Sequence, residues 1–205
     1  MKLLITGGSG TLGQKITKLA LSKNYQVNIL TRNKKLISNC NGLEYYYWDP
    51  SLKIIDNNCF IGVDSIINLS GFNVFCYWSK KNKSKILKSR IESTAFLLSQ
   101  IKERNIKINS FVSASGIAAY KNSLTDISSE DHGVNIPNSF INQVVNKWES
   151  TVGDYEKILP EVSFSILRVG LVLSNSGGLF KISKNLSKLF LLSPLGDGNQ
   201  WQSWI

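Results

Sequence analysis

Short apolar runs alternate with amphipathic stretches along this chain. The runs are rich in β-branched or aromatic residues and are bounded by turn-forming residues, which is typical of strands. They predict strands at Leu3–Thr6, Gln26–Thr31, Leu43–Trp48, Val63–Leu69, Ser110–Ser115 and Val162–Leu167. We expect the third and the fourth of these strands to be buried.

Three amphipathic stretches predict helices between these strands. The first covers Gln14–Ser22, the second covers Ile86–Arg104, and the third begins at about Asn138. In the second and third stretches, apolar residues recur every three or four positions, which places them on one helical face. Short strands that alternate with helices predict an α/β fold with a parallel sheet, helices on both faces and right-handed crossovers.

The junction between the first strand and the first helix carries glycines at regular spacing. Gly7 allows a sharp turn, Gly10 lets the backbone approach a phosphate, and Gly13 lets the helix lie close to the strand. The N–H groups and the dipole of the helix then face the anion. The junction therefore predicts the pyrophosphate site of a doubly wound Rossmann fold. Its residues are Thr6, Gly7, Gly8, Ser9, Gly10, Thr11, Leu12 and Gly13.

The end of the second strand favours NADP(H) over NAD(H). An NAD-selective site usually carries Asp or Glu about twenty residues after the glycine loop, where it holds the ribose 2′-hydroxyl. Arg32 stands there instead, followed by Lys34 and Lys35. A guanidinium with further positive charge beside it suits a 2′-phosphate. The alternative is that all three are ordinary loop cations.

Composition narrows the class of protein. With 205 residues that are 42% hydrophobic, the chain has enough apolar surface for one substantial core. Its three cysteines lie far apart and His132 is its only histidine, so we expect neither a disulfide framework nor a metal site. Since no run has the length of a signal core or a membrane span, we expect a soluble, cytoplasmic protein without a membrane partner.

The formal charge of +10 raises the question of nucleic-acid binding. The lysines are scattered, however, and their densest cluster, Lys80–Arg90, leads into a helix whose other face is apolar. Such a cluster is typical of a solvated helix face. We therefore expect no nucleic-acid partner.

Further motifs follow in order along the chain. They are Tyr47-Trp48-Asp49-Pro50, Ile67–Gly71 with Asn73, Trp78-Ser79 with Lys85, Ser89-Arg90-Ile91 with Thr94, Ser113-Ala114-Ser115, Trp148-Glu149, Leu167–Leu173, Gly177-Gly178 and Gly196–Gln200. With them the chain resembles the extended or atypical short-chain dehydrogenase/reductases. The closest resemblance is to the branch called epimerase family proteins, or nucleoside-diphosphate-sugar epimerase-like proteins.

The resemblance implies that a dinucleotide lies along the carboxyl ends of the strands. Leu69, Ser70 and Gly71 would line its adenosine and ribose side, and Ser113 and Ser115 would face the nicotinamide. For Ser70 the alternative is a small residue that fills a turn. For Ser115 it is a cap of the strand end.

Two further residues join the expected cofactor site. Asp49 is included because it belongs to the motif that follows the third strand. Arg168, at the end of the sixth strand, either contacts a phosphate of the cofactor or substrate or pairs with Glu149. Both alternatives for Arg168 stay open in the sequence.

The proton donor of the wider superfamily is missing. In that superfamily a tyrosine and a lysine four residues later assist hydride transfer, because the lysine lowers the pKa of the phenol. Counted back from Glu149, these two positions hold Ile141 and Val145. The nearest phenol that could replace the tyrosine is Tyr120, and Ser115 is the candidate hydrogen-bond donor to a substrate. We expect His132 to be a solvated loop residue.

The sequence predicts two parts, a cofactor-binding domain and the beginning of a substrate lobe. Residues 1–174 form the expected dinucleotide-binding domain, and residues 175–205 resemble the beginning of a substrate lobe that continues further in family members, so the lobe is expected to be truncated and loosely held. One hypothesis is an NADP(H)-dependent oxidoreductase or epimerase-like enzyme for a small hydroxyl, carbonyl or nucleotide-sugar-like substrate. The other is a cofactor-binding protein with little or no catalysis, such as a sensor, a scaffold or a truncated relic. A homodimer is left open.

Overall fold

The computed structural model describes residues 1–37, 39–40, 42–130, 132, 139–175, 177–191, 193, 196–198 and 200–205, without the side chains of residues 39 and 40. The expected start of the third helix at Asn138 lies outside these residues. No helix within the described ranges is long and apolar enough to cross a membrane.

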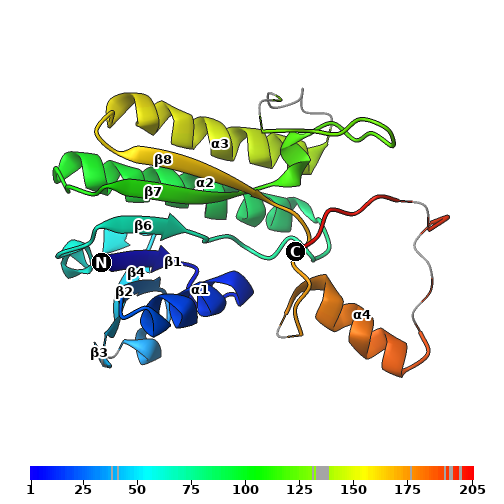
Figure 1. Cartoon of the computed structure of the whole chain (residues 1–205), viewed down its shortest axis with the longest axis horizontal. Helices are drawn as coiled ribbons and strands as arrows, with labels where there is room; N and C mark the ends of the chain where they lie inside the picture. Colours follow the sequence, from blue (N-terminus) through cyan, green and yellow to red (C-terminus); the bar gives the residue numbers. More distant parts are fainter. Residues whose placement is uncertain are drawn as a thin grey trace.

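The strands form one sheet in the order β3-β4-β2-β1-β6-β7-β8, with β5 paired to β4 (Figure 1). All long strands run parallel, which confirms the prediction. Their bounds are β1 (Lys2–Thr6), β2 (Gln26–Thr31), β4 (Leu43–Asp49), β6 (Ser65–Asn68), β7 (Ser110–Gly116) and β8 (Ser163–Val169). The order reverses between β1 and β6, and ligands of such sheets collect outside the carboxyl ends at this point.

Two antiparallel strands were not expected from the sequence. β3 (Asn39–Cys40) and β5 (Ile54–Ile55) each pair with β4. Strands of two residues are too short to give an alternating pattern. The expectation that β4 is buried is wrong for most of its length, since only Trp48 is buried there. The neighbours outside β4 are these two short strands, so they cover little of it.

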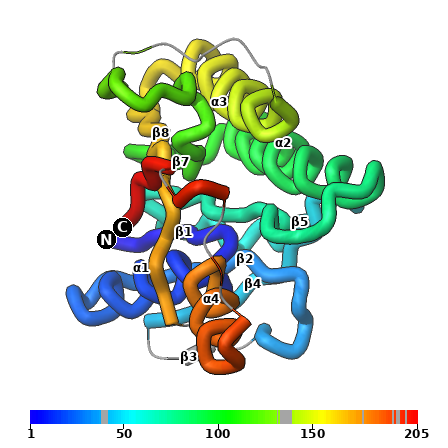
Figure 2. Tube along the Cα trace, turned by 90° about the vertical axis from the view of Figure 1, so that its right-hand side faces the viewer, coloured from blue at the N-terminus to red at the C-terminus, as the bar shows by residue number. Residues whose placement is uncertain are grey.

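Helices cover both faces of the sheet, as predicted. Figures 1 and 2 show α1 (Thr11–Ser22) on one face and α2 (Lys80–Glu103) beside α3 (Phe140–Ile158) on the other. The cationic stretch expected to precede the second helix instead forms its first turns. α2 begins early because the hydroxyl of Ser79 caps it by accepting a hydrogen bond from the N–H of Asn82. Short 3-10 turns lie at Lys34–Leu36, Asn57–Phe60 and Ile117–Ala119.

The alternation of side chains in β1 divides the core into two clusters. Leu3 and Ile5 pack with Ala20 of α1, whereas Leu4 packs with Leu97 of α2 on the opposite face. A strand that is apolar on both faces is what a doubly wound sheet requires. This arrangement fixes the carboxyl end of β1, and with it the glycine loop, between the two helical layers.

The chain after β8 lies beyond the carboxyl ends of the strands (Figure 1). It forms α4 (Gly178–Lys188), which has no buried residue. The segment is nevertheless attached at its ends, because the N–H of Leu171 donates to the carbonyl of Ser203 at 2.8 Å and the N–H of Ile205 donates to the carbonyl of Leu171 at 3.0 Å. A Cβ on Gly177 would lie 2.7 Å from the hydroxyl oxygen of Thr11, so the start of α4 touches the glycine loop.

Candidate functional site

The glycine loop forms a tight connection between β1 and α1. Gly7 has φ +68°, and a Cβ there would lie 2.7 Å from the carbonyl oxygen of Leu69. A Cβ on Gly13 would lie 2.3 Å from the carbonyl oxygen of Gly7. Side chains at these two positions would therefore push the loop away from β6 and lift α1 off the loop. Gly10 caps α1 without a side chain, so the first N–H groups of the helix are left for an anion.

The hydroxyl of Thr6 joins β1 to the end of β6. It donates to the Asn68 side-chain oxygen at 2.7 Å and accepts from the N–H groups of Leu69 and Ser70 at 3.0 and 3.1 Å. Thr6 is itself fully buried. Its side chain thus shapes the turn that follows β6, where Leu69, Ser70 and Gly71 are expected to line the cofactor.

A buried polar chain continues from Asn68 into the helical layer. The amide of Asn68 donates to the hydroxyl of Thr94 at 2.8 Å and to that of Ser113 at 3.4 Å, and the indole N–H of Trp148 also donates to Thr94 at 3.0 Å. Ser113 is 1% exposed. Asn68 and Thr94 were not expected in the site from the sequence. Polar residues within buried, otherwise apolar elements need partners, and this requirement could have pointed to them.

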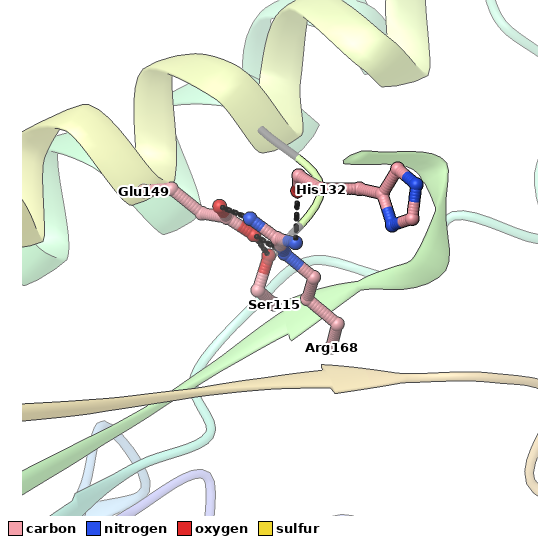
Figure 3. A network of polar contacts seen from close by, with 4 residues as sticks. All are labelled: Ser115, His132, Glu149 and Arg168. Carbon is pink, nitrogen blue, oxygen red and sulfur yellow. Dashed lines mark hydrogen bonds and ion pairs between the residues drawn. The ribbon is translucent and has the colours of Figure 1, made fainter. Parts of the chain in front are cut away.

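Ser115 meets a buried ion pair at the end of β7 (Figure 3). Its hydroxyl donates to a carboxylate oxygen of Glu149 at 2.5 Å. Arg168 holds the same carboxylate with two hydrogen bonds, from Nε at 3.0 Å and from Nη2 at 2.9 Å. The pairing of Arg168 with Glu149 that the sequence left open is therefore present. Since Ser115 gives its one proton to Glu149, it can accept a further hydrogen bond but cannot donate one without breaking this contact.

Tyr120 adjoins the same ion pair. The guanidinium of Arg168 lies over the ring of Tyr120 at 4.8 Å from its centre, and another Arg168 nitrogen donates to the carbonyl of His132 at 3.3 Å. The hydrogen bond with Glu149 raises the pKa of Arg168 against the opposing effect of burial. The two residues expected to be catalytic, Ser115 and Tyr120, are thus brought together through Arg168 and Glu149.

The missing tyrosine and lysine leave an apolar wall. Val145 is 6% exposed and belongs to the buried face of α3, and a Cβ on Gly116 would lie 3.6 Å from its Cγ2. Val145 therefore lies beside the end of β7, against Gly116, the residue that follows Ser115 in the chain. The two α3 positions that would hold the tyrosine and the lysine therefore carry no titratable side chain, because Ile141, one turn earlier, is also apolar.

The ends of β2 and β4 carry the residues expected near the adenosine ribose. Arg32 is exposed and follows β2, and Asp49 ends β4. Hydrogen bonds from Ser51, the shortest at 2.6 Å, lower the pKa of Asp49, and the nearby charge of Arg32 lowers it further. The ammonium of Lys34 lies 4.8 Å from the centre of the Tyr47 ring. Three cationic side chains, including Lys35, are thus available at this edge of the sheet.

His132 touches this arrangement through its backbone carbonyl, which accepts from Arg168, whereas its ring is held within its own loop. The Nδ1 of His132 accepts a hydrogen bond from the N–H of Ser129 at 2.9 Å, which ties the ring to its own loop. No group of three or more His, Cys, Asp or Glu side chains that could hold a metal ion occurs among the residues that the structure describes. The site consequently consists of the glycine loop, the turn after β6 and the cluster around Glu149.

The chain matches a known family of proteins in sequence. The family model described as "NAD dependent epimerase/dehydratase family" matches residues 3–139. An epimerase family protein of Staphylococcus saprophyticus is 32% identical over 203 residues, which make up 98% of this chain and 65% of that relative. The chain therefore spans about two thirds of the length of this relative, at 65%.

Two solved structures share the fold over the whole chain. The crystal structure of human epimerase family protein SDR39U1 (isoform 2) with NADPH superimposes with a TM-score of 0.78 at 27% identity, covering 100% of this chain and 65% of that one. The nucleoside-diphosphate sugar epimerase from Corynebacterium glutamicum gives a TM-score of 0.75 at 25% identity, covering 100% of this chain and 41% of that one. Both similarities extend beyond β8 into residues 175–205.

Proposed function

Because the chain belongs to the NAD-dependent epimerase/dehydratase family, we propose that it binds a nicotinamide dinucleotide along the carboxyl ends of β1, β6 and β7. The observation that carries this proposal is the glycine loop, in which Gly7 and Gly13 have no room for a Cβ and no side chain of the described residues caps the first turn of α1. The human relative whose structure was solved with NADPH supports the same class of ligand.

Within this class, NADP(H) is the preferred cofactor in our proposal. Arg32, Lys34 and Lys35 stand where an acidic residue would select NAD(H), and Asp49, the nearby carboxylate, is already held by Ser51. A guanidinium can hold a 2′-phosphate with two parallel hydrogen bonds. Fluorescence titration with NADPH and NADH tests the preference, and replacing Arg32 with Ala is expected to weaken NADPH binding about tenfold while NADH binding changes little. Equal affinities for both cofactors in the wild-type protein would refute it.

The proposed activity is that of an oxidoreductase or epimerase-like enzyme for a small hydroxyl, carbonyl or nucleotide-sugar-like substrate. Ser115 and Tyr120 are the proposed catalytic residues. Ser115 would accept a hydrogen bond from a substrate hydroxyl while its own hydroxyl continues to donate to Glu149. Oxidation of NADPH in the presence of sugars, quinones and aldehydes tests for turnover. Replacing Tyr120 with Phe is expected to abolish turnover of a good substrate, and unchanged turnover would exclude Tyr120 as the proton donor.

The second candidate function is cofactor binding with little or no catalysis. It is favoured by the apolar residues Ile141 and Val145, which replace the usual tyrosine and lysine. Tight NADPH binding without turnover of any member of the substrate panel would support this alternative. We further propose that residues 1–174 are the cofactor-binding domain and that residues 175–205 begin a substrate lobe, because α4 adds no buried residue to the core.

A further inference from the structure

Arg90 is a half-buried cation to which the structure gives no acidic partner. It lies in the middle of α2, and no carboxylate within the described ranges forms an ion pair with it. Burial lowers the pKa of Arg90 to about 10, and no neighbouring charge opposes that effect. Buried charges in proteins are normally paired, so a half-buried arginine without a carboxylate partner suggests that its partner is a ligand.

The protein contacts of Arg90 use only part of its hydrogen-bonding capacity. One nitrogen, Nη1, donates to the carbonyl oxygens of Phe72 at 3.0 Å and Ile86 at 3.2 Å. The guanidinium also lies over the ring of Trp148, 5.5 Å from its centre. Because a guanidinium carries five N–H donors, those on Nη2 and Nε, for which the described part of the chain provides no acceptor, remain for another one.

The guanidinium of Arg90 lies against the turn after β6. A Cβ on Gly71 would lie 2.9 Å from both Cζ and Nη2 of Arg90, so the planar group packs against the bare backbone of this glycine. The neighbouring Ser89 accepts from the N–H of Phe72 at 2.7 Å and fixes the same turn. Gly71 is the last of the three residues expected to line the cofactor, which puts the guanidinium next to the ligand position of the proposed function.

The helical layer brings Arg90 to the level of the missing lysine. Thr94, one turn further along α2, accepts the indole N–H of Trp148 on α3. Arg90 lies one turn before Thr94, and Val145 lies one turn before Trp148. In both helices this is the direction of the carboxyl ends of the strands, so Arg90 of α2 and Val145 of α3 stand at corresponding levels of the two helices.

We propose that Arg90 is an anion-binding residue of the site and that its free N–H donors receive an oxyanion, either a carboxylate or phosphate of the substrate or the diphosphate of the cofactor. The planar fork of the guanidinium suits both groups, since each presents two oxygens to two parallel donors. The inference rests on the proposed function for the position of the cofactor. Its chemistry depends only on Arg90, Gly71 and Trp148.

Phosphate binding by variants of the whole chain tests the proposal. Inorganic phosphate is titrated into the protein saturated with NADPH, and NADPH itself is titrated separately, for the wild type, Arg90→Met and Lys88→Met. Lys88 lies on the same helix but is exposed and pairs with Glu92, so its variant is the matched control. We expect Arg90→Met to weaken one of the two affinities at least tenfold and Lys88→Met to change both less than twofold.

The affinity that changes identifies the source of the anion. Weaker phosphate binding with unchanged NADPH binding indicates an anionic substrate group, and weaker NADPH binding indicates the diphosphate. If both affinities stay within twofold of the wild type in a folded Arg90→Met protein, the proposal is wrong. A wild-type protein that binds no NADPH would refute the proposed function instead, and the labelling experiment below would still test Arg90.

Chemical labelling of the unmodified chain avoids the risk that a variant fails to fold. Phenylglyoxal reacts with arginine side chains, and mass spectrometry gives the rate at each arginine. We expect inorganic phosphate to slow labelling of Arg90 at least fivefold and to leave Arg104, at the far end of α2, unaffected. Failure of Arg90 to react, or reaction that phosphate does not slow, would overturn the proposal because no oxyanion could then occupy the guanidinium.

Discussion

At the scale of single residues, Glu149 decides how the end of β7 is organised. Its side chain is 7% exposed and is held by Ser115 and Arg168, whose side chain is 18% exposed. A carboxylate at this depth is tolerated because a planar cation binds both of its oxygens. The same contacts orient the hydroxyl of Ser115 and hold Arg168 over Tyr120.

Replacing Glu149 with Gln should therefore destabilise the protein more than its small change in shape implies. The variant keeps an acceptor for Ser115 but leaves Arg168 without its counter-charge, and we expect a loss of about 2–3 kcal/mol in the free energy of unfolding. Urea denaturation measures it. Asp154→Asn is the control, since its ion pair with Lys157 is exposed and should cost less than about 0.5 kcal/mol. Equal losses in the two variants would contradict the argument.

Gly13 offers a second test at this scale. A methyl group there would lie 2.3 Å from the carbonyl oxygen of Gly7, a backbone atom that cannot turn away. We expect Gly13→Ala to cost at least about 2 kcal/mol in unfolding free energy and to abolish NADPH binding. Gly153→Ala is the opposite case, because nothing lies within 4 Å of its Cβ position in the middle of α3. That variant should gain about 0.5–1 kcal/mol through helix propensity, and thermal unfolding of both separates the two effects.

The residues of the site were predictable to different degrees. The glycine loop could be predicted because its spacing records a steric requirement within thirteen consecutive residues. The contact between Ser115 and Glu149 spans 34 residues of sequence and depends on how α3 packs against β7. No local pattern contains that distance, so the sequence left the pairing of Arg168 open and gave Asn68 and Thr94 no role in the site. Arg90 belongs to the motif Ser89-Arg90-Ile91. Only the three-dimensional structure shows that no carboxylate of the described residues pairs with it.

At the scale of elements, the helices differ in how many residues they bury. α2 and α3 bury residues such as Leu97 and Val152 against the sheet and against each other, whereas α4 buries none. Strand positions followed well from the sequence because five-residue to seven-residue apolar runs give a clear pattern. The short strands β3 and β5 did not, since pairing with β4 creates them. α4 was likewise not predicted as a helix, because the resemblance implied only that a substrate lobe begins in this region.

This difference between helices predicts a difference in amide exchange. Backbone N–H groups of the buried middle of α2 open only with large-scale unfolding, while those of α4 need only local unfolding of an exposed helix. We expect hydrogen–deuterium exchange in α4 to be at least about 100-fold faster than in residues 93–101 of α2. Similar protection of the two segments, measured by mass spectrometry on the same sample, would show that α4 is held by contacts that its exposure does not reveal.

At the scale of the whole molecule, the order of strands and the distribution of charge act together. The reversal of strand order between β1 and β6 places the glycine loop, the turn after β6 and Arg90 at one edge of the sheet. The chain carries a formal charge of +10, so this edge belongs to a molecule that attracts anions over a distance. In the proposed function, the three cations at residues 32, 34 and 35 add a local attraction for the 2′-phosphate of NADP(H).

Salt dependence of binding separates the attraction by the net charge of the molecule from the attraction by the three cations at residues 32, 34 and 35. NADPH carries one phosphate more than NADH, so screening should weaken NADPH binding more than NADH binding. Between 50 and 500 mM NaCl the Debye length falls from about 14 to about 4 Å, and we expect the ratio of the two affinities to narrow at least about threefold. In Arg32→Ala the ratio should already be small at low salt and change little. A wild-type ratio that stays constant across the titration would mean that the 2′-phosphate is not recognised by charge, and the preference for NADP(H) would then need a neutral hydrogen-bonding partner at the end of β2.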